Sequence, residues 1–412
     1  MTTFGELGGR WRPLRDKVER FIEDRVYPSE RELDDVDNDT YFAVMRPLMA
    51  EAKALGIWAP GHPTEIGGLG MPFADYVLIN EVIGRSEHAM VALGTHTLQD
   101  SLMLHLFAPQ EWKERYLPPL VAGEYFPSVS ITEPDVASSD PTQLQTTAVL
   151  ENGQWRIDGR KWFTTWANRA AFSTVFARTE PPDAPAHSAF SMIVVPTDAP
   201  GYRIVREVPV FGMRGCHCEI ELSAVRVPAG NLLGGRGEGF RIAQRRLGPG
   251  RIYHCMRWLG QAQRAFDLMC RRANDRVAFG GPLAGKQLVQ KMVFDSAVEI
   301  QSCRLLTLDA ARKLDSGSDA RAEIALIKVV GAHMVHNVID RAIQVHGALG
   351  VTIDTPLERM YRHARFARIY DGPDEVHIES LAKRILRTYA RGGNWDFGLR
   401  DLPQRPAMEA TP

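Results

Sequence analysis

The chain has 412 residues, of which 44% are hydrophobic, so it is long enough for two or three packed units. Its 49 basic and 50 acidic side chains leave a net charge of -1, which excludes the strongly basic surface of proteins that bind nucleic acid or anionic membranes. No stretch approaches the roughly 20 apolar residues that a membrane-spanning helix needs, so we expect no membrane insertion.

The cysteines and the N-terminus indicate a compartment. Five cysteines are an odd and sparse set for this length, as expected of free thiols in a reducing cytoplasm. The first residues lack the basic-then-apolar order of a signal peptide, so we expect a cytoplasmic protein. Cys216-His217-Cys218 could form part of a metal cluster, but no second pair of ligands lies nearby, and we expect no metal site.

Residues 1–126 are predicted to be helical. Four apolar residues near the start recur at helical spacing beside charged ones, namely Val18, Phe21, Ile22 and Val26. A segment rich in glycine and proline, from Gly56 to Met71, interrupts this pattern. Helical content resumes from Phe73 to Phe107, and Pro118-Pro119 is predicted to close a further helix.

Short strands are predicted from about Pro127 onward. Asn152-Gly153 lies between two β-rich runs and predicts a hairpin, and Asp158-Gly159 predicts a second turn. The β-rich runs are Thr146–Leu150, Trp155–Ile157, Phe172–Ala177, Phe190–Val195, Tyr202–Val205 and Glu219–Val227. Short strands at this spacing predict a compact antiparallel sandwich or barrel.

The helical period returns after Gly239. The residues that mark it are Val289, Val293, Ala297 and Ile300 on one face, then Arg321 to Val345, and a last helix to about Arg391. The tail is rich in glycine, proline and polar residues and is expected to be poorly ordered. The order of helices, strands and helices predicts an α+β fold, with units over residues 1–126, 127–239 and 240–391 and a tail over 392–412.

The segment from Ile369 to His377 carries turn chemistry between two predicted helices. Pro373 suits a first helical position, because the amide hydrogen that it lacks would be unpaired there. Asp374 and Glu375 would follow in the first turn, where the helix dipole favours acids. Asp371 then lies on the loop before the helix, either as a capping residue or as a general base, and spacing alone favours the cap.

A run of hydroxyl side chains and turn formers, from Val129 to Asp140, joins the first helices to the strands. Backbone amides in such a loop can face a polar ligand. Composition alone does not distinguish this loop from an ordinary one.

Five motifs, in order along the chain, resemble the acyl-CoA dehydrogenase family. They are Thr132-Glu133-Pro134 followed by Ser139-Asp140, Lys161-Trp162-Phe163-Thr164, Arg276-Val277-Ala278-Phe279-Gly280, Gln344-Val345-His346-Gly347 and Tyr370-Asp371-Gly372. Each is weak alone, but together they are specific, and the resemblance covers about residues 10 to 390. It implies an N-terminal helical domain, a central antiparallel β-domain and a C-terminal four-helix bundle.

Three segments resemble one branch of the family, which in animals is fused to a kinase-like domain and is associated with the breakdown of 4-hydroxyacyl-CoA. They are Thr132–Asp140, Arg246–Ile252 with His254–Arg257, and Asp371–His377. This chain is too short to include that kinase, so we expect a stand-alone relative.

The resemblance implies α,β-dehydrogenation of an acyl-CoA, in which a base removes the α-proton while a hydride leaves the β carbon for flavin N5. It places the usual glutamate base at Asp371. A second base position, just before Arg251, is Gly250 here, which cannot act as a base. An aspartate is shorter by about one bond length, roughly 1.5 Å, so we expect a pocket for a substituted or unusual acyl chain.

The resemblance implies FAD as the cofactor. Positions near the flavin ring and its phosphate are Ile131, Thr132, Ser138, Trp162 and Thr164, although Trp162 could instead be a core aromatic. Positions for the remaining pyrophosphate and the adenine, across a subunit interface, are Arg276, Phe279, Gln344 and Gly347. Two residues depart from the family pattern: Ala348 replaces a glycine and Pro373 replaces a threonine, which leaves later contacts to the backbone at Pro373 or to Glu375.

Family positions that line the acyl-CoA channel are Ser139, Arg251, Tyr370 and Gly372, although Arg251 could equally form a structural salt bridge. The resemblance also implies a homodimer or homotetramer, and an electron-transfer flavoprotein as the electron acceptor. Other net reactions fit the same site: elimination of water or phosphate from a 4-substituted acyl-CoA, or direct transfer of electrons to oxygen. A chain that had lost FAD would be a non-catalytic acyl-CoA-binding protein.

Overall fold

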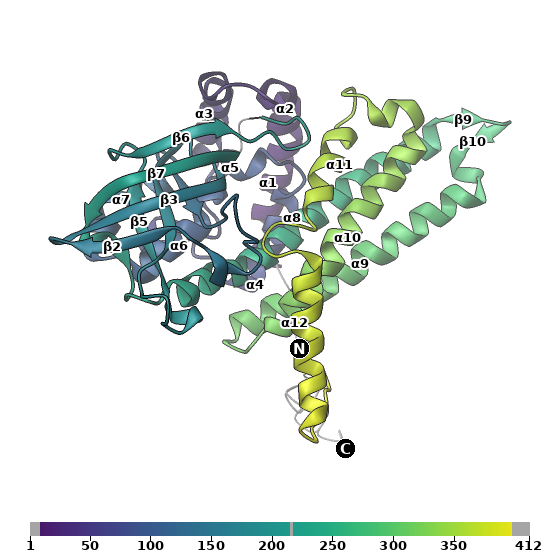
Figure 1. Cartoon of the computed structure of the whole chain (residues 1–412). Coiled ribbons are helices and arrows are strands. Elements are labelled where there is room, and N and C mark those ends of the chain that lie inside the picture. The colour runs from purple at the N-terminus through teal and green to yellow at the C-terminus, as the bar shows by residue number, and fades with distance from the viewer. Residues whose placement is uncertain (1–8, 215–216, 398–412) are drawn as a thin grey trace, which may run out of the picture.

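The computed structural model describes residues 9–214 and 217–397, and the elements follow the order helices, strands, helices (Figure 1). The predicted α+β fold is therefore confirmed. Cys216, part of the candidate metal cluster, and the tail from residue 398, expected to be poorly ordered, lie outside the described residues.

The N-terminal helices bury the face that their apolar spacing predicts, with Val18, Phe21, Ile22 and Val26 all in the core. Pro118 and Pro119 lie inside the last turns of α7 rather than closing it, and the helix runs on to Val121. The elements are α1 (Arg12–Phe21), the π-helical turn η1 (Ile22–Val26), α2 (Tyr27–Leu33), α3 (Asn38–Ala54), η2 (Thr64–Ile66), α4 (Phe73–Ile83), α5 (Ala89–Ala92), η3 (Thr95–Thr97), α6 (Leu98–Phe107) and α7 (Gln110–Val121).

The β-domain is one eight-stranded sheet with the order β6-β7-β3-β2-β4-β5-β8, and β1 pairs with β4. Its elements are β1 (Phe126–Ser130), η4 (Pro141–Gln143), β2 (Thr147–Glu151), β3 (Gln154–Thr165), β4 (Ala170–Arg178), η5 (Ala186–Ser188), β5 (Phe190–Pro196), β6 (Tyr202–Glu207), β7 (His217–Pro228), η6 (Ala229–Asn231) and β8 (Leu232–Leu233). Every β-rich run predicted from the sequence coincides with one of these strands, except that Thr146 lies one residue before β2.

Two details of the sheet differ from the prediction. Asn152 and Gly153 form the expected hairpin, with φ of 50° and 75°, but Asp158 and Gly159 lie inside β3. The register of β3 on β7 shifts between Ile157 and Gly159, so this Asp-Gly pair makes a bulge and not a turn. The sheet is also not purely antiparallel, because β1 and β2 both run parallel to β4. A parallel pair needs a long connection, and the β2–β3 hairpin lies within the one from β1 to β4.

The first helix of the C-terminal part begins at Gly239 and has 37 residues, where the helical period was predicted to return after Gly239. Its elements are α8 (Gly239–Asp275), β9 (Val277–Ala278), β10 (Gly281–Pro282), η7 (Leu283–Gly285), α9 (Gln287–Asp315), α10 (Arg321–His346), η8 (Gly347–Val351), α11 (Leu357–Phe366) and α12 (Asp374–Ala390). Buried side chains of α8, α9 and α10 form one core cluster.

One stretch does approach the length and composition of a membrane span, contrary to the sequence prediction. Residues Arg321–Val351, which are α10 and η8, pass that test, but 61% of the most apolar window is buried inside the protein. Lys328 lies within this helix and is fully buried. A core helix of a folded bundle has these properties, which is how α10 packs here.

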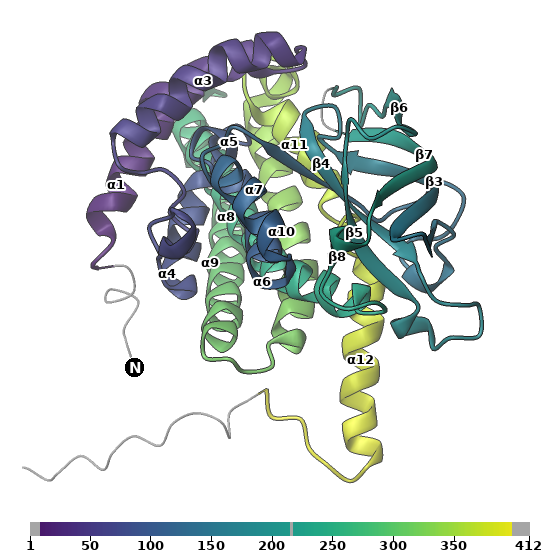
Figure 2. The ribbon, with the colours of Figure 1, turned by 90° about the vertical axis from the view of Figure 1, so that its left-hand side faces the viewer.

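Helix α8 connects the two halves of the molecule. Ile242 and Ala243, near its start, belong to the cluster that packs α6 and α7 against the sheet, and its later turns belong to the bundle core. Figure 2 shows α6 and α7 in front of the helical bundle and beside the sheet. The loop between α11 and α12 lies beside α8 at Arg251, whose Nε contacts the backbone carbonyl of Asp371 in that loop.

Candidate active site

The loop between α11 and α12 has a left-handed backbone at its centre. Asp371 has φ of 55° and Gly372 has φ of 101°. Aspartate tolerates this region better than most residues, and a Cβ at Gly372 would meet Nε2 of His377 at 2.8 Å. The carbonyl oxygen of Asp371 lies 3.0 Å from Nε of Arg251 and 3.2 Å from Nε2 of His377. The loop is therefore held from α8 and from α12.

The carboxylate of Asp371 does not cap α12. The N-cap residue is Pro373, and no side chain caps the helix. The capping role that spacing favoured is therefore wrong. Pro373, predicted to be the first helical residue, lies one position before the helix, which begins at Asp374. Asp374 and Glu375 do lie in the first turn, as predicted. Oδ2 of Asp371 instead lies 3.2 Å from Nε2 of His254 on α8.

Positive groups around Asp371 keep it ionised. Burial alone would raise the pKa of Asp371. The hydrogen bond from His254 and the charges of Arg251 and Arg246 outweigh burial, so the pKa lies below its usual range. A carboxylate in this state, 21% exposed, is a proton acceptor and not a donor at neutral pH.

Three predicted substrate residues gather around Asp371. Gly372 and Tyr370 are its neighbours, and the Tyr370 hydroxyl accepts a hydrogen bond of 2.8 Å from Nε1 of Trp258. Arg251 was expected either to line the acyl-CoA channel or to form a structural salt bridge. In the structure its Nε donates to the backbone carbonyl of Asp371, which anchors the loop. Ser139, the fourth, is exposed on the loop before β2.

A small cavity of about 20 Å³ lies between α6 and α8. Its lining includes Gln99, Met103, Arg246, Pro249 and Tyr253. Arg246 is fixed there by Asp100, with Nη2 3.0 Å from Oδ2. Gly250, the second family position for a base, is buried beside this cavity, and a Cβ on it would meet Nε2 of Gln99 at 2.8 Å.

The loop from Ile131 to Asp140 is tied to β3 by a buried ion pair. Nζ of Lys161 lies 2.9 Å from Oε1 of Glu133 and also donates to the carbonyl of Ile131 at 2.9 Å. Ser138 closes the loop, because its hydroxyl accepts from the backbone N–H of Glu133 at 2.9 Å. This pair gives the loop a fixed position beside β3.

Trp162 lies at a bulge where β3 faces this loop. The register on β7 shifts between Lys161 and Thr164, and Phe163 has φ of 50°. The backbone N–H of Trp162 donates to the carbonyl of Thr132 at 3.0 Å. Trp162 is half-buried and outside the described core clusters, so it is not a core aromatic. Its indole Nε1 is buried and has no partner among the described residues.

The structure therefore brings together the flavin-ring positions that the sequence singled out. These are Ile131, Thr132 and Ser138 in the loop and Trp162 and Thr164 on β3. Thr164 is buried, and its hydroxyl accepts from Ser130 at 3.4 Å.

The other predicted cofactor positions lie elsewhere. Arg276 follows α8, and Phe279 is 96% exposed in the β9–β10 hairpin, at an extremity of the molecule away from the sheet (Figure 1). Gln344 and Gly347 are exposed at the end of α10. Glu375 is exposed on the first turn of α12. One copy of the chain does not bring the hairpin to the Trp162 bulge.

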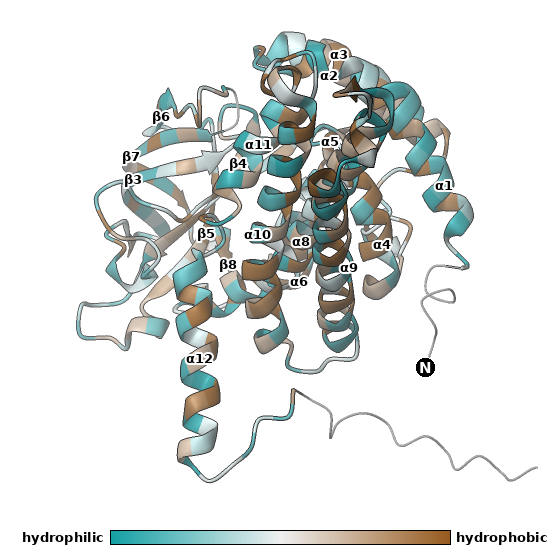
Figure 3. Ribbon diagram, turned by 90° about the vertical axis from the view of Figure 1, so that its right-hand side faces the viewer, coloured by the Kyte–Doolittle hydropathy of each residue, from teal (hydrophilic) through white to brown (hydrophobic). Residues whose placement is uncertain are grey.

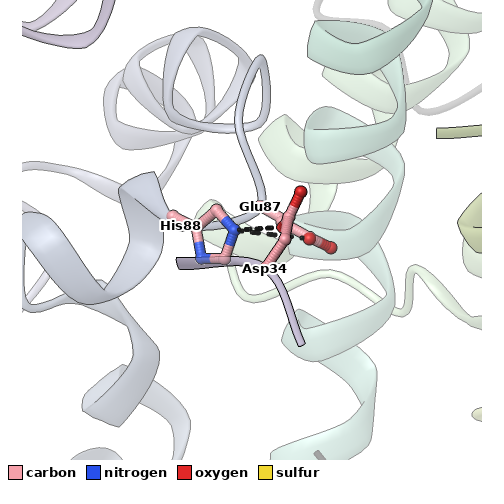
Figure 4. Close-up of side chains that lie close together, drawn as sticks. All are labelled: Asp34, Glu87 and His88. Carbon is pink, nitrogen blue, oxygen red and sulfur yellow. Dashed lines mark hydrogen bonds and ion pairs between the residues drawn. The ribbon is translucent and has the colours of Figure 1, made fainter. Parts of the chain in front are cut away.

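A cluster with metal-like geometry is an ion-pair network. Figure 4 shows Asp34, Glu87 and His88, whose ligand atoms lie within 4.8 Å of one another. Nε of Arg359 lies 2.9 Å from Oδ1 of Asp34 and also pairs with Glu87. The guanidinium therefore supplies the positive charge that a cation would bring to these carboxylates.

Several residues at this site had no predicted role, among them His254, Glu133 and Lys161. Glu133 and Lys161 lie inside two of the family motifs, and His254 lies inside the branch motif. The only signal in the sequence was a charged or titratable side chain within a motif. The contact partner of each residue lies far away in the sequence, so the contact itself could not be predicted.

Three family models match the chain: acyl-CoA dehydrogenase N-terminal domain over residues 11–124, middle domain over 128–225 and C-terminal domain over 237–386. "Probable acyl-CoA dehydrogenase FadE2" of Mycobacterium tuberculosis is 43% identical over 387 residues, which cover 90% of this chain and 94% of that protein. Acyl-CoA dehydrogenase family member 11 of Rattus norvegicus is 38% identical over 93% of this chain, which spans only 51% of that longer protein.

Solved structures agree with these relatives. Butyryl-CoA dehydrogenase from Megasphaera elsdenii superimposes with a TM-score of 0.80 at 26% identity, covering 91% of this chain and 98% of that one. Acyl-CoA dehydrogenase from Geobacillus kaustophilus gives a TM-score of 0.81 at 26% identity, covering 90% and 97%. The resemblance predicted from five motifs is confirmed: the chain belongs to the acyl-CoA dehydrogenase family.

Proposed function

We propose that this enzyme dehydrogenates an acyl-CoA between its α and β carbons, and that Asp371 is the base. The observation that carries the proposal is the state of Asp371, which is an ionised and largely buried carboxylate. Its side chain faces His254 on α8 and not the N-terminus of α12, and its backbone carbonyl is bonded to Arg251 and His377. An α-proton of a thioester is weakly acidic, so a carboxylate in an enclosed site is a suitable acceptor. As a member of this family the enzyme uses FAD.

The residues at the Trp162 bulge fit a flavin. The indole Nε1 is a buried donor without a partner among the described side chains, next to the backbone of Thr132 and on the same strand as Thr164. Ile131, Thr132, Trp162 and Thr164 would hold the ring, and Ser138 the nearby phosphate. FAD, when bound, accepts the hydride that leaves the β carbon.

The chain's own part in the reaction is to bind the thioester, exclude water and accept one proton. Oδ2 of Asp371 faces His254, which leaves Oδ1 to take the proton from the α carbon. Arg251 keeps the loop closed against α8, and Tyr370, Gly372 and Ser139 would line the substrate channel. Because aspartate is shorter than glutamate by roughly 1.5 Å, a substituted acyl chain that reaches closer to the loop is the proposed substrate.

A second copy of the chain would complete the cofactor site. Arg276, Phe279, Gln344 and Gly347 are exposed and lie away from the Trp162 bulge of their own chain, so we propose that they reach the FAD of a neighbouring subunit. Figure 3 shows apolar segments along α9 and α12, where Leu288, Phe294, Ile378 and Leu386 are exposed. Apolar surface of this kind is typical of subunit interfaces, which supports a homodimer or homotetramer.

We also propose an electron-transfer flavoprotein as the acceptor and the cytoplasm as the location. Free thiols support the second proposal, since Cys218, Cys255, Cys270 and Cys303 are all unpaired with one another.

Anaerobic titration of the FAD-containing protein with a panel of acyl-CoAs tests the function. Dehydrogenation bleaches the flavin absorbance. A straight-chain and a 4-substituted acyl-CoA of each chain length, compared with each other, show which kind of substrate the enzyme prefers. Elimination of water or phosphate leaves the flavin oxidised at the end while the unsaturated product forms. Direct oxygen uptake identifies an oxidase. A colourless protein that gains no colour on addition of FAD contradicts the proposal and identifies an acyl-CoA-binding protein.

A further inference from the structure

His254 and Arg257 lie on the face of α8 that looks toward Asp371. They are three residues apart, which places them on one side of a helix. Nη2 of Arg257 lies 2.8 Å from Nδ1 of His254, and Nε2 of His254 lies 3.2 Å from Oδ2 of Asp371. The three side chains form a line from a guanidinium through an imidazole to a carboxylate.

The chemistry of the guanidinium fixes the tautomer of the imidazole. Arginine has donors and no acceptor, so Nδ1 of His254 must accept from Arg257. In a neutral imidazole the hydrogen then lies on Nε2, which points at Asp371. His254 is thereby a donor to the carboxylate.

The same contact opposes a second proton on His254. A proton on Nδ1 would point at the guanidinium of Arg257 and would add a like charge beside it. Burial and the charge of Arg257 lower the pKa of His254 to about 4, although its hydrogen bond to Asp371 acts in the opposite direction. The imidazole is thus neutral near pH 7.

We propose that His254, oriented by Arg257, is a positioning residue that aligns the carboxylate of Asp371 for proton abstraction. The inference rests on the proposed role of Asp371 as the base. His254 donates to Oδ2 and takes up no proton itself. The α-proton passes to Oδ1, and Oδ2 of the resulting carboxylic acid still accepts from His254, so the alignment persists through the step.

This arrangement offers a reason why a shorter acid works here. Asp371 has one fewer rotatable bond than glutamate, and its backbone is fixed by Arg251 and His377. With a fixed donor on Oδ2, the carboxylate has one orientation, and effective catalysis depends on such orientation. Other charged and titratable groups that face this set are Arg246 and Arg251 on α8, Lys328 on α10, Tyr370 before the loop and His377 on α12.

A pair of His254 variants tests the donor. His254→Gln keeps an N–H that can reach the position of Nε2, whereas His254→Leu keeps only the volume. We expect His254→Leu to slow anaerobic flavin reduction by about 100-fold with little change in the substrate dissociation constant, and His254→Gln to stay within about tenfold of the wild type. The acid limb of the rate profile in His254→Leu moves to higher pH, because Asp371 loses the bond that holds its pKa down.

A second readout does not depend on hydride transfer. With the flavin reduced beforehand, exchange of the α-hydrogen of an acyl-CoA with deuterium from the solvent reports proton abstraction alone. The exchange rate follows the same order, with the wild type and His254→Gln above His254→Leu.

Arg257→Met tests the tautomer. Without the guanidinium, Nδ1 is free to accept a proton, so His254 titrates at higher pH and a second ionisation enters the acid limb. Arg257→Lys keeps a donor and a charge at the same place, and its profile stays close to that of the wild type.

The outcomes separate this inference from the proposed function. If Asp371→Asn retains flavin reduction, Asp371 is not the base and the proposed mechanism fails. If Asp371→Asn is inactive while His254→Leu, with FAD bound, keeps the wild-type rate and pH profile, only the role of His254 is overturned. Equal loss in His254→Leu and His254→Gln also overturns it. If His254→Leu does not fold, the pH profiles of His254→Gln, Arg257→Met and Arg257→Lys still test the role of His254.

Discussion

Nζ of Lys161 lies 2.9 Å from Oε1 of Glu133, and this ion pair is buried, with side chains 0% and 5% exposed. Glu133 also accepts from the backbone amides of Gln145 and Thr146, at 2.7 Å and 2.9 Å. The pair therefore joins three segments: the loop after β1, the residues just before β2, and β3. That loop and that strand carry the residues proposed to hold the flavin ring.

Lys161→Met is expected to destabilise the protein and weaken FAD binding. It leaves the Glu133 carboxylate buried without its counter-charge, which typically destabilises by about 3–5 kcal/mol. Denaturant unfolding and titration of the apoprotein with FAD measure both effects. The neighbouring Arg160→Gln is the matched control: Arg160 is half exposed and pairs with Asp135 and Glu219, so its loss should lower stability much less than the loss of Lys161 does. Similar values for the two variants contradict this account of the loop.

Asp371→Glu is expected to change which substrate is preferred. The added methylene moves the carboxylate by roughly 1.5 Å toward the acyl chain, into space that a substituent would occupy. The ratio of kcat/KM for a straight-chain over a 4-substituted acyl-CoA should rise about tenfold or more. An unchanged ratio would show that the length of this side chain does not set the substrate preference.

Gly250→Glu should restore part of the activity that Asp371→Asn lacks. Residue 250 precedes Arg251, whose Nε contacts the Asp371 carbonyl, so a carboxylate there lies beside the same loop. A Cβ at position 250 meets the flexible side-chain amide of Gln99 at 2.8 Å, which can rotate away. Gly250→Gln in the same background has the same shape without a base and is expected to restore nothing. Equal rates for the two double variants rule out a second base position.

Acid should destabilise the protein through His62. This imidazole is fully buried, with Nε2 3.1 Å from the Thr97 hydroxyl, and burial lowers its pKa to about 4 from an ordinary value of 6.5. The unfolded chain therefore binds a proton below pH 6.5 while the folded chain does not until about pH 4, so stability is complete above 6.5 and falls toward pH 4.

The effect of His62 between pH 7 and pH 5 is about 2 kcal/mol at most. His62→Gln removes the titrating group and keeps an amide beside Thr97, so it should lose less stability than the wild type over that interval. Urea unfolding at the two pH values measures the difference. An identical loss in both proteins would show that His62 does not contribute to acid sensitivity.

Local chemistry made much of the fold predictable. The hairpin at Asn152-Gly153 follows from two residues that tolerate positive φ, and the helices after Gly239 follow from the spacing of their apolar residues. Asp158-Gly159 misled because such a pair suits a turn or a bulge equally, and the pairing of β3 with β7, more than 50 residues away, decides between them. The parallel pairing of β1 with β4 is likewise set by tertiary packing and leaves no local signal.

The sequence predicted which residues form the candidate site, but it did not predict what those residues contact. The motifs identified Asp371, Trp162 and their neighbours, but the role of Asp371 depends on α8, from which Arg251 reaches across 120 residues of sequence. Spacing favoured a cap because only the next helix is visible locally. The direction of the side chain, toward His254 and away from α12, required the three-dimensional structure.

The most direct test of the central claim is anaerobic flavin absorbance in Asp371→Asn, compared with the wild type at equal FAD content. Asparagine keeps the size of the side chain and its contact with His254 but cannot accept a proton as a carboxylate does. The account predicts that an acyl-CoA that bleaches the wild-type flavin leaves the variant oxidised, with FAD still bound. Bleaching of the variant at a rate near that of the wild type would contradict it.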